Sequence, residues 1–505
     1  MWSYYFNKAI KQYLKIRFRR IENIRSFPGF HQLSILNKIL HHNKDTLYGK
    51  SHSFNKIRNY QDFHSAVPIV EYEDLQLYIE RMMSGEPGLL VPGAVWWYAK
   101  SSGTTSSKSK YIPVPDIFLR NNLIRSGWDG MSIVYNQVAG SQLFEKKSLV
   151  MGGSLSSWPY HPKVTVGDVS AIMILKMPWV GKPFYTPDFD IALMSDWEEK
   201  IDRMANQVIK EDIVMFGGVP TWNIVLFEKM LALTGKSTIK EIWPNLNMYL
   251  HGGVGFEPYR KQFDQYIGTD QFHYFEVYNA SEGYFGFQDQ LQENGLLLLA
   301  DNGIFYEFVP TEDWGKPNAQ AFKLDQVVIG QNYTLLITAL NGLYRYAPGD
   351  TVKFISVKPY KIKITGRTKH FINVFGEEVI VENTDQALSN TCRELNAVVK
   401  EYTVGPIYMN KPGQGGHLWL IEFEKTPEDI ALFESRLDRH LRDVNSDYDA
   451  KRFKDLALQP LQIINVPAGT FLNWLRSKGK AGGQHKVPRL SNTRIYVEEV
   501  LEFTR

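Results

Sequence analysis

The chain has 505 residues, with 57 Lys and Arg against 54 Asp and Glu, so its formal net charge is only +3. This balance indicates neither a nucleic-acid-binding protein nor an acidic tail. The single cysteine, Cys392, excludes an internal disulfide framework and a cysteine-based zinc site, and it favours a reducing, cytoplasmic setting. The length exceeds that of one ordinary core, so we expect two or more domains.

Residues 1–27 are basic and aromatic but lack the apolar centre and cleavage site of a signal peptide. No apolar run in the sequence is long enough to cross a bilayer. We expect these residues to form a first helix that packs on its own domain, with docking to a membrane surface or a partner as the alternative. Its apolar and basic faces are expected to consist of Tyr5, Ile10, Tyr13, Leu14 and Phe18 and of Lys8, Lys11, Lys15, Arg17 and Arg19.

Up to about residue 85 the pattern predicts helices joined by polar loops, most clearly at 32–43 and 72–83. From about residue 90, short β-rich runs that end in small or polar residues alternate with helices. The alternation predicts an α/β fold with layered sheets, in which ligands bind beyond the carboxyl ends of strands. The expected strands are 95–100, 147–153, 212–218, 246–253 and 272–280, and the expected helices between them are 194–210 and 221–235.

Between about residues 295 and 365 the pattern changes to hairpins, because Asn302-Gly303 and Asn341-Gly342 each stand between strand-like runs. After Gly366 a smaller unit with both helices and strands begins. We therefore expect a large N-terminal domain of residues 1–366 and a small, mobile α+β C-terminal domain of residues 367–505.

The small domain is expected to contain a helix, then a pair of strands, then a second helix. Thr426 is the expected N-cap of the second helix, followed by a proline at its first position. The first helix is expected at 382–395 and the strands at 398–405 and 417–425.

The first candidate site is the loop 101–110, which is rich in serine, threonine and lysine. Backbone N–H groups, hydroxyls and ammonium groups together suit a polyphosphate. The Walker pattern is absent, and a solvated serine-rich loop fits the composition equally well. The candidate ligands are Ser101, Ser102, Gly103, Thr104, Thr105 and Lys110.

Two further motifs each place a carboxylate at a strand end or a tight turn. In the first, Glu282 could hold a Mg²⁺ ion whose other ligands are phosphate oxygens, and Tyr278 could stack on a purine. In the second, Asp350 follows Pro-Gly and could bind both hydroxyls of a ribose. Read alone, the Glu282 motif is better explained by an ordinary turn residue, whereas for Asp350 the two readings are evenly matched.

A late Gly- and Lys-rich loop, residues 478–489, could close over a negatively charged transition state or be a surface loop without a ligand.

The order of all these motifs along the chain resembles the adenylate-forming superfamily, and within it most closely the auxin-responsive acyl-acid amido synthetase family and its bacterial relatives. The resemblance covers residues 60 to 490. The segments that carry it are PIVEYEDLQLYIERMMSGEPGLLVPG, SSGTT followed by SK and IPV, YNASEGYFGFQ, YRYAPGD, GRTK and GQHKVPRL.

This resemblance implies an enzyme that uses ATP and Mg²⁺ to convert a small carboxylic acid into an acyl-adenylate, and then transfers the acyl group to an amino acid. It also implies a role for each matching residue. The loop 101–105 with Lys110 would hold the β and γ phosphates, and Glu282 would bind Mg²⁺. The adenine and α-phosphate region would be lined by Tyr278, Ala280 and Ser281.

The remaining roles fall near and within the expected small domain. Asp350 would bind the ribose, with Arg367 nearby, and Lys369 would be the hinge of the domain rotation. Lys486 would offset charge on the α phosphate as pyrophosphate leaves, with the neighbours Lys478 and Lys480 as alternatives.

The acyl pocket is expected between the first two motifs, where a Gly-Gly turn allows close approach of the backbone. Its expected wall consists of Phe216, Gly217, Gly218, Val219 and Trp222. We expect a monomer that binds no nucleic acid. An acyl-CoA synthetase and a catalytically silent nucleotide-binding protein remain the alternative functions.

Overall fold

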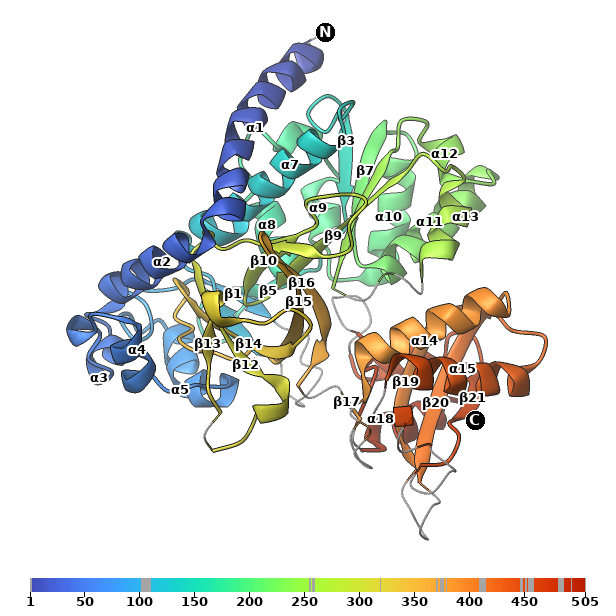
Figure 1. The fold of residues 1–505 in the computed structure, drawn as a ribbon. Helices are drawn as coiled ribbons and strands as arrows, with labels where there is room; N and C mark the ends of the chain where they lie inside the picture. Colours follow the sequence, from blue (N-terminus) through green and yellow to red (C-terminus); the bar gives the residue numbers. More distant parts are fainter. Residues whose placement is uncertain are drawn as a thin grey trace. The chain divides into compact units, whose positions relative to one another are not determined.

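The structure is a computed structural model, and its described residues form two compact units. The large unit runs to Gly253 and continues over Thr269–Lys363, and the small unit comprises Val254–Gly268 and Ile364–Arg505 (Figure 1). None of the helices formed by these residues is long and apolar enough to span a membrane. The described residues are 2–100, 110–253, 256, 259–317, 319–368, 371–372, 377, 379–407, 415–445, 448–449, 452, 458–479, 486–491 and 493–504.

The large unit is built on a twelve-stranded sheet in the order β13-β12-β14-β15-β16-β11-β10-β9-β8-β7-β3-β6. Neighbouring strands from β6 through β3, β7 and β8 to β9 are parallel, whereas β10 pairs antiparallel with β9. The mixed α/β class predicted from the sequence is confirmed. The strands are β3 (Lys147–Val150), β6 (Tyr185–Thr186), β7 (Ile213–Gly218), β8 (Met248–Gly252), β9 (His273–Ala280), β10 (Gly283–Phe287), β11 (Leu296–Leu298), β12 (Ile304–Pro310), β13 (Phe322–Lys323), β14 (Asn332–Ala339), β15 (Asp350–Val357) and β16 (Tyr360–Arg367).

Helices and a smaller four-stranded sheet, in the order β2-β1-β5-β4, complete the large unit. The sheet consists of β1 (Trp97–Lys100), β2 (Tyr111–Pro113), β4 (Leu155–Ser157) and β5 (Thr165–Gly167). The helices are α1 (Trp2–Ser26), α2 (Pro28–Asn43), α3 (Leu47–Ser51), α4 (Tyr60–Ala66), α5 (Tyr72–Met83), α6 (Asp116–Phe118), the π-helix η2 (Leu119–Ile124), α7 (Arg125–Gln137), α8 (Val169–Leu175), α9 (Phe189–Ala192), α10 (Trp197–Val208), α11 (Pro220–Thr234) and α12 (Ile239–Ile242).

The parallel strands bring their carboxyl ends to one edge of the twelve-stranded sheet. The register places Gly217 of β7 beside Leu250 of β8, and Gly252 of β8 beside Val277 of β9. Every residue of β7 except the last is buried, as expected for a strand covered on both faces. The turns after these strands therefore lie next to one another, where ligands of α/β folds bind.

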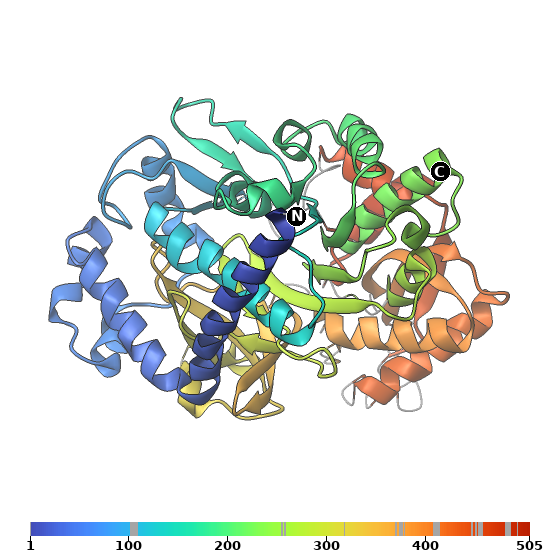
Figure 2. The same cartoon turned by 90° about the horizontal axis from the view of Figure 1, so that it is seen from above.

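The N-terminal helix α1 packs along α7 of its own unit, as the two views show (Figures 1 and 2). The predicted apolar stripe is only partly buried. Leu14 is fully buried, as predicted, whereas Tyr5 and Tyr13 are exposed. Arg17, which we expected in solvent, forms a 2.7 Å ion pair with the buried Asp129 of α7. Arg17 therefore faces α7, because its charge pairs with the buried carboxylate of Asp129.

The prediction of a hairpin at Asn302-Gly303 is wrong. The strand β11 before this turn pairs with β10 and β16, and the strand β12 after it pairs with β13 and β14. Asn302 is fully buried and bonded to other segments, so the turn is a corner between distant strands of the sheet. At Asn341-Gly342 the chain does fold back on itself, since Ile337 and Tyr346 form an antiparallel bridge.

The small unit is a three-stranded sheet in the order β19-β20-β21 with helices on both faces. Alternate residues of β20 point to opposite cores: Trp419 packs with α14 and α15, and Leu420 packs with α17 and α18. The elements are α13 (Arg260–Ile267), β17 (Phe371–Ile372), β18 (Val379–Ile380), α14 (Val381–Glu394), β19 (Val398–Ile407), β20 (Gly416–Lys425), α15 (Ile430–Val444), β21 (Gln462–Val466), α17 (Thr470–Ser477) and α18 (Ile495–Leu501).

The predicted helix and strand pair of this unit are confirmed, but the predicted N-cap of the second helix is wrong. Helix α15 begins at Ile430, and Asp429 is its N-cap, accepting a hydrogen bond from the backbone N–H of Leu432. A carboxylate at the N-cap satisfies an unpaired N–H and also meets the positive end of the helix. Thr426 therefore lies before the helix.

Cys392 in α14 is expected to be unreactive in the folded protein. Burial raises the pKa of its thiol to about 12, so at pH 8 very little of the reactive thiolate is present. We expect Ellman's reagent to label the native thiol at least about a hundredfold more slowly than the thiol of the urea-unfolded chain. Equal labelling rates in the two states would contradict the raised pKa of this partly buried thiol.

Candidate functional site

The second motif forms the tight turn between β9 and β10. Ala280 pairs with Gly283, so Ser281 and Glu282 occupy the two positions of the turn. Gly283 has a φ of +156°, and a Cβ there would come within 2.9 Å of the Ile304 side chain, so only glycine fits without displacement. Glu282 is 5% exposed, which means that the turn holds a carboxylate in a nearly closed environment.

The third motif meets the second through a hydrogen bond. The Tyr278 hydroxyl donates to Asp350 Oδ2 at 2.7 Å, and both residues are buried. Tyr278 lies near the end of β9, and Asp350 begins β15, after a turn in which Gly349 has a φ of +89°. Two of the residues that the sequence predicts for one nucleoside are therefore in direct contact.

Arg345 of the third motif has a structural role that the sequence did not reveal. It is 3% exposed, and its guanidinium bonds to Glu307 at 3.1 Å. It also donates to the backbone oxygens of His64 and Val67. Its backbone N–H bonds to the side chain of Thr338 at 2.9 Å. These bonds support the left-handed backbone conformation of Arg345, φ +45°, from which the chain runs on toward Asp350.

The predicted phosphate loop connects β1 to β2. These strands are antiparallel, and Lys100 lies opposite Tyr111. Ser281 Oγ lies 3.5 Å from the backbone oxygen of Lys100, so the base of this loop is next to the second motif. On the other side of the loop, Lys110 Nζ lies 5.5 Å from the centre of the Tyr72 ring. Five of the predicted residues, namely Ser101, Ser102, Gly103, Thr104 and Thr105, lie outside the described residues.

The predicted magnesium ligand fits a site that phosphate oxygens complete. Among the described residues no three His, Cys, Asp or Glu side chains gather as a metal site would require. As the predicted ligand, Glu282 would supply one carboxylate. Asn341 Nδ2 donates to the backbone oxygen of Glu282 at 3.4 Å. Magnesium is commonly bound in this way, by one or two carboxylates together with substrate phosphates and water.

The predicted acyl-pocket wall lies at the carboxyl end of β7. Phe216 is fully buried, and its ring stacks on Tyr249 at 4.3 Å, so its side chain belongs to the core. Gly218, with a φ of +136°, accepts a 2.8 Å bond from the Tyr249 hydroxyl at its backbone oxygen. Gly217 and Gly218 are the last two residues of β7, so their backbone lies at the carboxyl end of the strand.

A buried lysine that the sequence did not single out lies at the same edge. Lys200 of α10 is 2% exposed, and its ammonium donates to the backbone oxygens of Gly152 and Gly153 at 2.7 and 3.0 Å. Burial lowers its pKa to about 8, and Asp168 partly opposes the shift. In the sequence it is an ordinary lysine of an amphipathic helix, so only the fold reveals it.

The small unit carries Arg367, at the end of β16, and Lys486. The residues after Lys486 are firmly held: Val487 packs in the core with α17 and α18, and Leu490 packs in the core with α14 and α15. Lys478, one alternative to Lys486, forms a 2.8 Å ion pair with Glu499. The hinge candidate Lys369 and the other alternative, Lys480, are not among the described residues.

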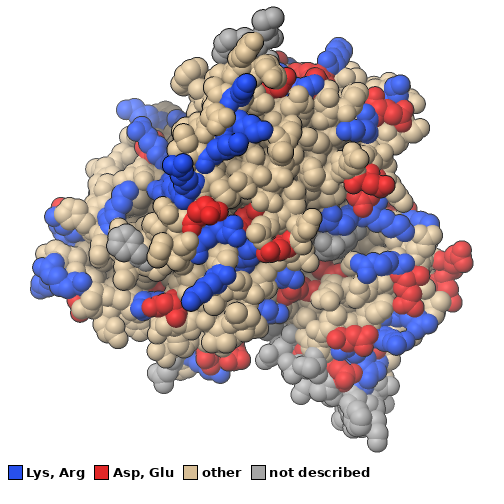
Figure 3. Space-filling view, turned by 45° about the horizontal axis from the view of Figure 1, so that its top comes forward, with Lys and Arg blue, Asp and Glu red and all other residues tan. Residues whose placement is uncertain are grey.

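One surface hollow is bordered by no residue of these motifs. It has a volume of about 690 Å³ and is bordered by residues around β13, among them Glu312, Phe322 and Tyr333. None of the residues that border it is a predicted site residue. On the face drawn in Figure 3, cationic and anionic side chains are interspersed, in keeping with the small net charge.

Comparison with solved structures identifies the class of fold. A 2-hydroxyisobutyryl-CoA ligase, solved in the postadenylation state with 2-HIB-AMP, aligns over 93% of this chain and 90% of its own, with a TM-score of 0.61 and 12% identity. The GH3.15 acyl acid amido synthetase aligns over 97% of this chain and 96% of its own, with a TM-score of 0.80 and 17% identity. The fold is thus that of the adenylate-forming enzymes.

Models of one family cover most of the sequence. The GH3 family N-terminal domain matches residues 17–191 and 156–272, the central domain matches 297–367, and the C-terminal domain matches 382–495. The protein belongs to the GH3 family, which confirms the resemblance seen in the motifs. The indole-3-acetic acid-amido synthetase GH3.3 of Arabidopsis thaliana is 23% identical and aligns over 93% of this chain and 91% of its own length. The jasmonoyl–L-amino acid synthetase JAR4 of Nicotiana attenuata is also 23% identical, over 93% and 92%.

Proposed function

We propose that the protein is an ATP-dependent ligase that activates a small carboxylic acid as its acyl-adenylate and joins the acyl group to the amine of an amino acid. It belongs to the GH3 family, and the relatives compared above are amido synthetases. The hydrogen bond between Tyr278 and Asp350 carries the proposal for the site, because it joins two motifs that are separate in sequence.

In the first half-reaction a carboxylate oxygen of the acid attacks the α phosphorus of ATP. The new P–O bond forms as the bond between the α phosphorus and the bridging oxygen breaks, and pyrophosphate leaves. In the second half-reaction the amine attacks the acyl carbon, the bond to AMP breaks, and the nitrogen loses a proton. Both steps depend on positioning and on charge stabilisation, and neither needs a nucleophile from the protein.

The chain's residues divide this work by position. Asp350 binds the ribose hydroxyls, Tyr278 orients Asp350, and Glu282 would hold Mg²⁺. The loop 101–105 and Lys110 bind the β and γ phosphates, and Tyr278, Ala280 and Ser281 line the adenine and α-phosphate region. Bound Mg²⁺ supplies positive charge against the phosphate oxygens.

The remaining roles involve the small unit and the pocket. Lys486 stabilises charge at the α phosphate, Arg367 binds near the ribose, and Lys369 is the hinge about which residues 367–505 move between the half-reactions. The acid lies against the backbone of Gly217 and Gly218, with Val219 and Trp222 beside it. We also propose a cytoplasmic location, in keeping with the single cysteine. A monomer is proposed as well.

The test is an ATP–pyrophosphate exchange screen with a panel of carboxylic acids, followed by mass detection of amides with pooled amino acids. Exchange with at least one acid and an amide product are expected. Failure of every acid, with folded protein and Mg²⁺ present, would end the proposal. Thioester formation when coenzyme A is supplied, without amide formation, would favour an acyl-CoA synthetase instead.

Replacing Tyr278 by phenylalanine is expected to raise the KM for ATP about tenfold and to change kcat less. The variant keeps the ring but removes the 2.7 Å hydrogen bond that orients Asp350, and hydrogen bonds to charged groups contribute about 1.5 to 3 kcal/mol. Steady-state exchange kinetics measure the effect. Tyr160→Phe is the matched control, since Tyr160 is 82% exposed. An unchanged KM for ATP in the Tyr278 variant would refute the role of this pair.

A further inference from the structure

The turn that carries Glu282 is held from behind by a buried side chain, Asn122. Asn122 is fully buried and lies in the π-helix η2, a form of helix that often occurs at functional sites. Its Oδ1 accepts the backbone N–H of Tyr284 at 2.8 Å, and its Nδ2 donates to the backbone oxygen of Tyr284 at 3.1 Å. One side chain thus satisfies both backbone groups of a residue two positions after Glu282.

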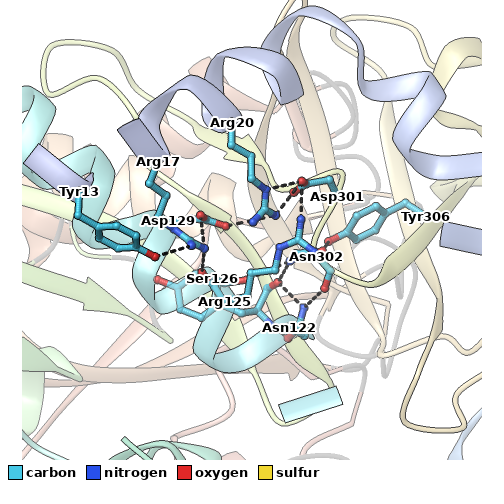
Figure 4. A network of polar contacts seen from close by, with 11 residues as sticks. Tyr13, Arg17, Arg20, Asn122, Arg125, Ser126, Asp129, Asp301, Asn302 and Tyr306 are labelled. Carbon is cyan, nitrogen blue, oxygen red and sulfur yellow. Dashed lines mark hydrogen bonds and ion pairs between the residues drawn. The ribbon is translucent and has the colours of Figure 1, made fainter. Parts of the chain in front are cut away.

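The side-chain amide of Asn302 is the second support of this turn. We call Asn122 and Asn302 together the amide clamp. Asn302 Nδ2 also donates to the Tyr284 backbone oxygen, and the Asn302 backbone oxygen accepts from Asn122 Nδ2 at 3.1 Å. Ser126 and Tyr306 bond to the Asn302 amide at 3.3 Å each. In Figure 4 the two amides lie close together, below helix α1 in this view.

An ion-pair network fixes the clamp from outside. Asp301, the neighbour of Asn302, bonds to Arg20 and to Arg125 at 2.7 Å each. Arg20 also lies 3.7 Å from Asp129, and Arg17 pairs with Asp129 at 2.7 Å. Arg20 of α1 and Arg125 of α7 are therefore both tied to Asp301, the residue before Asn302 (Figure 4).

The chemistry explains why an asparagine is needed at residue 122. A carboxamide of this length can accept from the N–H through its oxygen and donate to the carbonyl through its nitrogen at the same time. An aspartate would keep the acceptor but lose both donors, and an alanine would leave the buried N–H of Tyr284 without the bond that Asn122 makes. A Cβ at Gly283 would lie 3.3 Å from Asn122 Oδ1, so the clamp closes directly on the turn.

We propose that Asn122 is a positioning residue that sets the Glu282 carboxylate for its metal ion. The inference rests on the proposed function, because it takes Glu282 as the magnesium ligand. Partners that orient metal ligands from outside typically change metal affinity or activity by about ten- to a hundredfold when removed. The clamp touches only the backbone after Glu282, so its effect should appear in the metal dependence rather than in binding of the acid.

The test compares Asn122→Ala with the wild-type enzyme in ATP–pyrophosphate exchange at saturating ATP, titrated with free Mg²⁺. The half-saturating Mg²⁺ concentration for exchange is expected to rise about tenfold, and so is the dissociation constant of Mg²⁺ from the enzyme–ATP complex measured by calorimetry. The KM for the carboxylic acid is expected to stay the same, and high Mg²⁺ is expected to restore part of the rate. A residue that only stabilised the fold would lower the amount of active enzyme without moving the Mg²⁺ dependence.

Asn121→Ala is the matched control, because the neighbouring amide bonds to Ile117 and Lys38 and not to the turn. It is expected to keep the wild-type Mg²⁺ dependence. Should Asn122→Ala fail to fold, Asn302→Ala removes the second donor to Tyr284 and is expected to shift the Mg²⁺ dependence in the same direction.

A folded Asn122→Ala enzyme with wild-type Mg²⁺ dependence would overturn the inference, and so would a folded Asn302→Ala enzyme of that kind if Asn122→Ala does not fold. The proposed function fails in a different way. If Glu282→Gln also leaves exchange unchanged, the metal assignment itself is wrong. If Glu282→Gln is inactive while the clamp variants behave as wild type, only the positioning role is lost.

Discussion

Glu282→Gln is expected to lower the rate of adenylate formation by about a hundredfold or more while leaving the fold intact. Glutamine has the same shape and can occupy the same tight turn, but it lacks the negative charge that binds a divalent cation. The site is 5% exposed, so water screens the lost interaction only weakly. Charge stabilisation of this kind usually contributes several kcal/mol to the transition state.

ATP–pyrophosphate exchange measures this first step directly, and circular dichroism with thermal melting checks the fold. Glu293→Gln is a suitable control, since Glu293 is largely exposed and pairs with Lys361 away from the turn. Turnover of the Glu282 variant at the wild-type rate would remove Glu282 from the metal site.

Lys486→Ala is expected to slow adenylate formation by about a hundred- to a thousandfold, the usual cost of removing one donor to a developing negative charge. The second half-reaction starts from an adenylate that has already lost pyrophosphate. Aminolysis of a supplied acyl-adenylate should therefore change much less. Rapid-quench measurement of each half-reaction separates the two effects.

Lys478→Ala provides the matched control for this loss of charge. Lys478 belongs to the same Gly- and Lys-rich segment, residues 478–489, but its ammonium is held by Glu499 at 2.8 Å. Its removal is expected to leave adenylate formation within about twofold of wild type, as surface pairs contribute little. Equal losses in the two variants would mean that net charge, and not the position of Lys486, accounts for the effect.

The elements of the large sheet could be predicted because each has a strong local pattern. Strand β7 is a continuous apolar run that ends in Gly217-Gly218, and helix α5 begins and ends where its apolar period does, at Tyr72 and Met83. The family, the fold class and the class of enzyme followed from the order of the motifs, and the comparisons confirm them. The branch of the family and the roles of the site residues stay predictions.

The remaining features depend on contacts between distant parts of the chain. Asn122, Lys200 and Arg345 each have neighbours in the sequence that give no hint of their partners, and their roles appear only when Tyr284, Gly152 and Glu307 are brought beside them. The corner at Asn302 was mistaken for a hairpin for the same reason. A local turn signal cannot tell which strand of a sheet comes next.

The path of the backbone through the small unit has one more consequence. The chain passes from the large unit into the small unit after β8, and residues 254–268 belong to the small unit before the chain returns for β9. Glycines with positive φ lie at both crossings, Gly253 at +84° and Gly268 at +75°. Within the small unit, Tyr259 of this excursion accepts a 2.9 Å bond from Arg489. Cutting the polypeptide at residue 366 would therefore leave residues 254–268 of the small unit attached to the fragment that contains the large unit. The two fragments would not correspond to the two compact units.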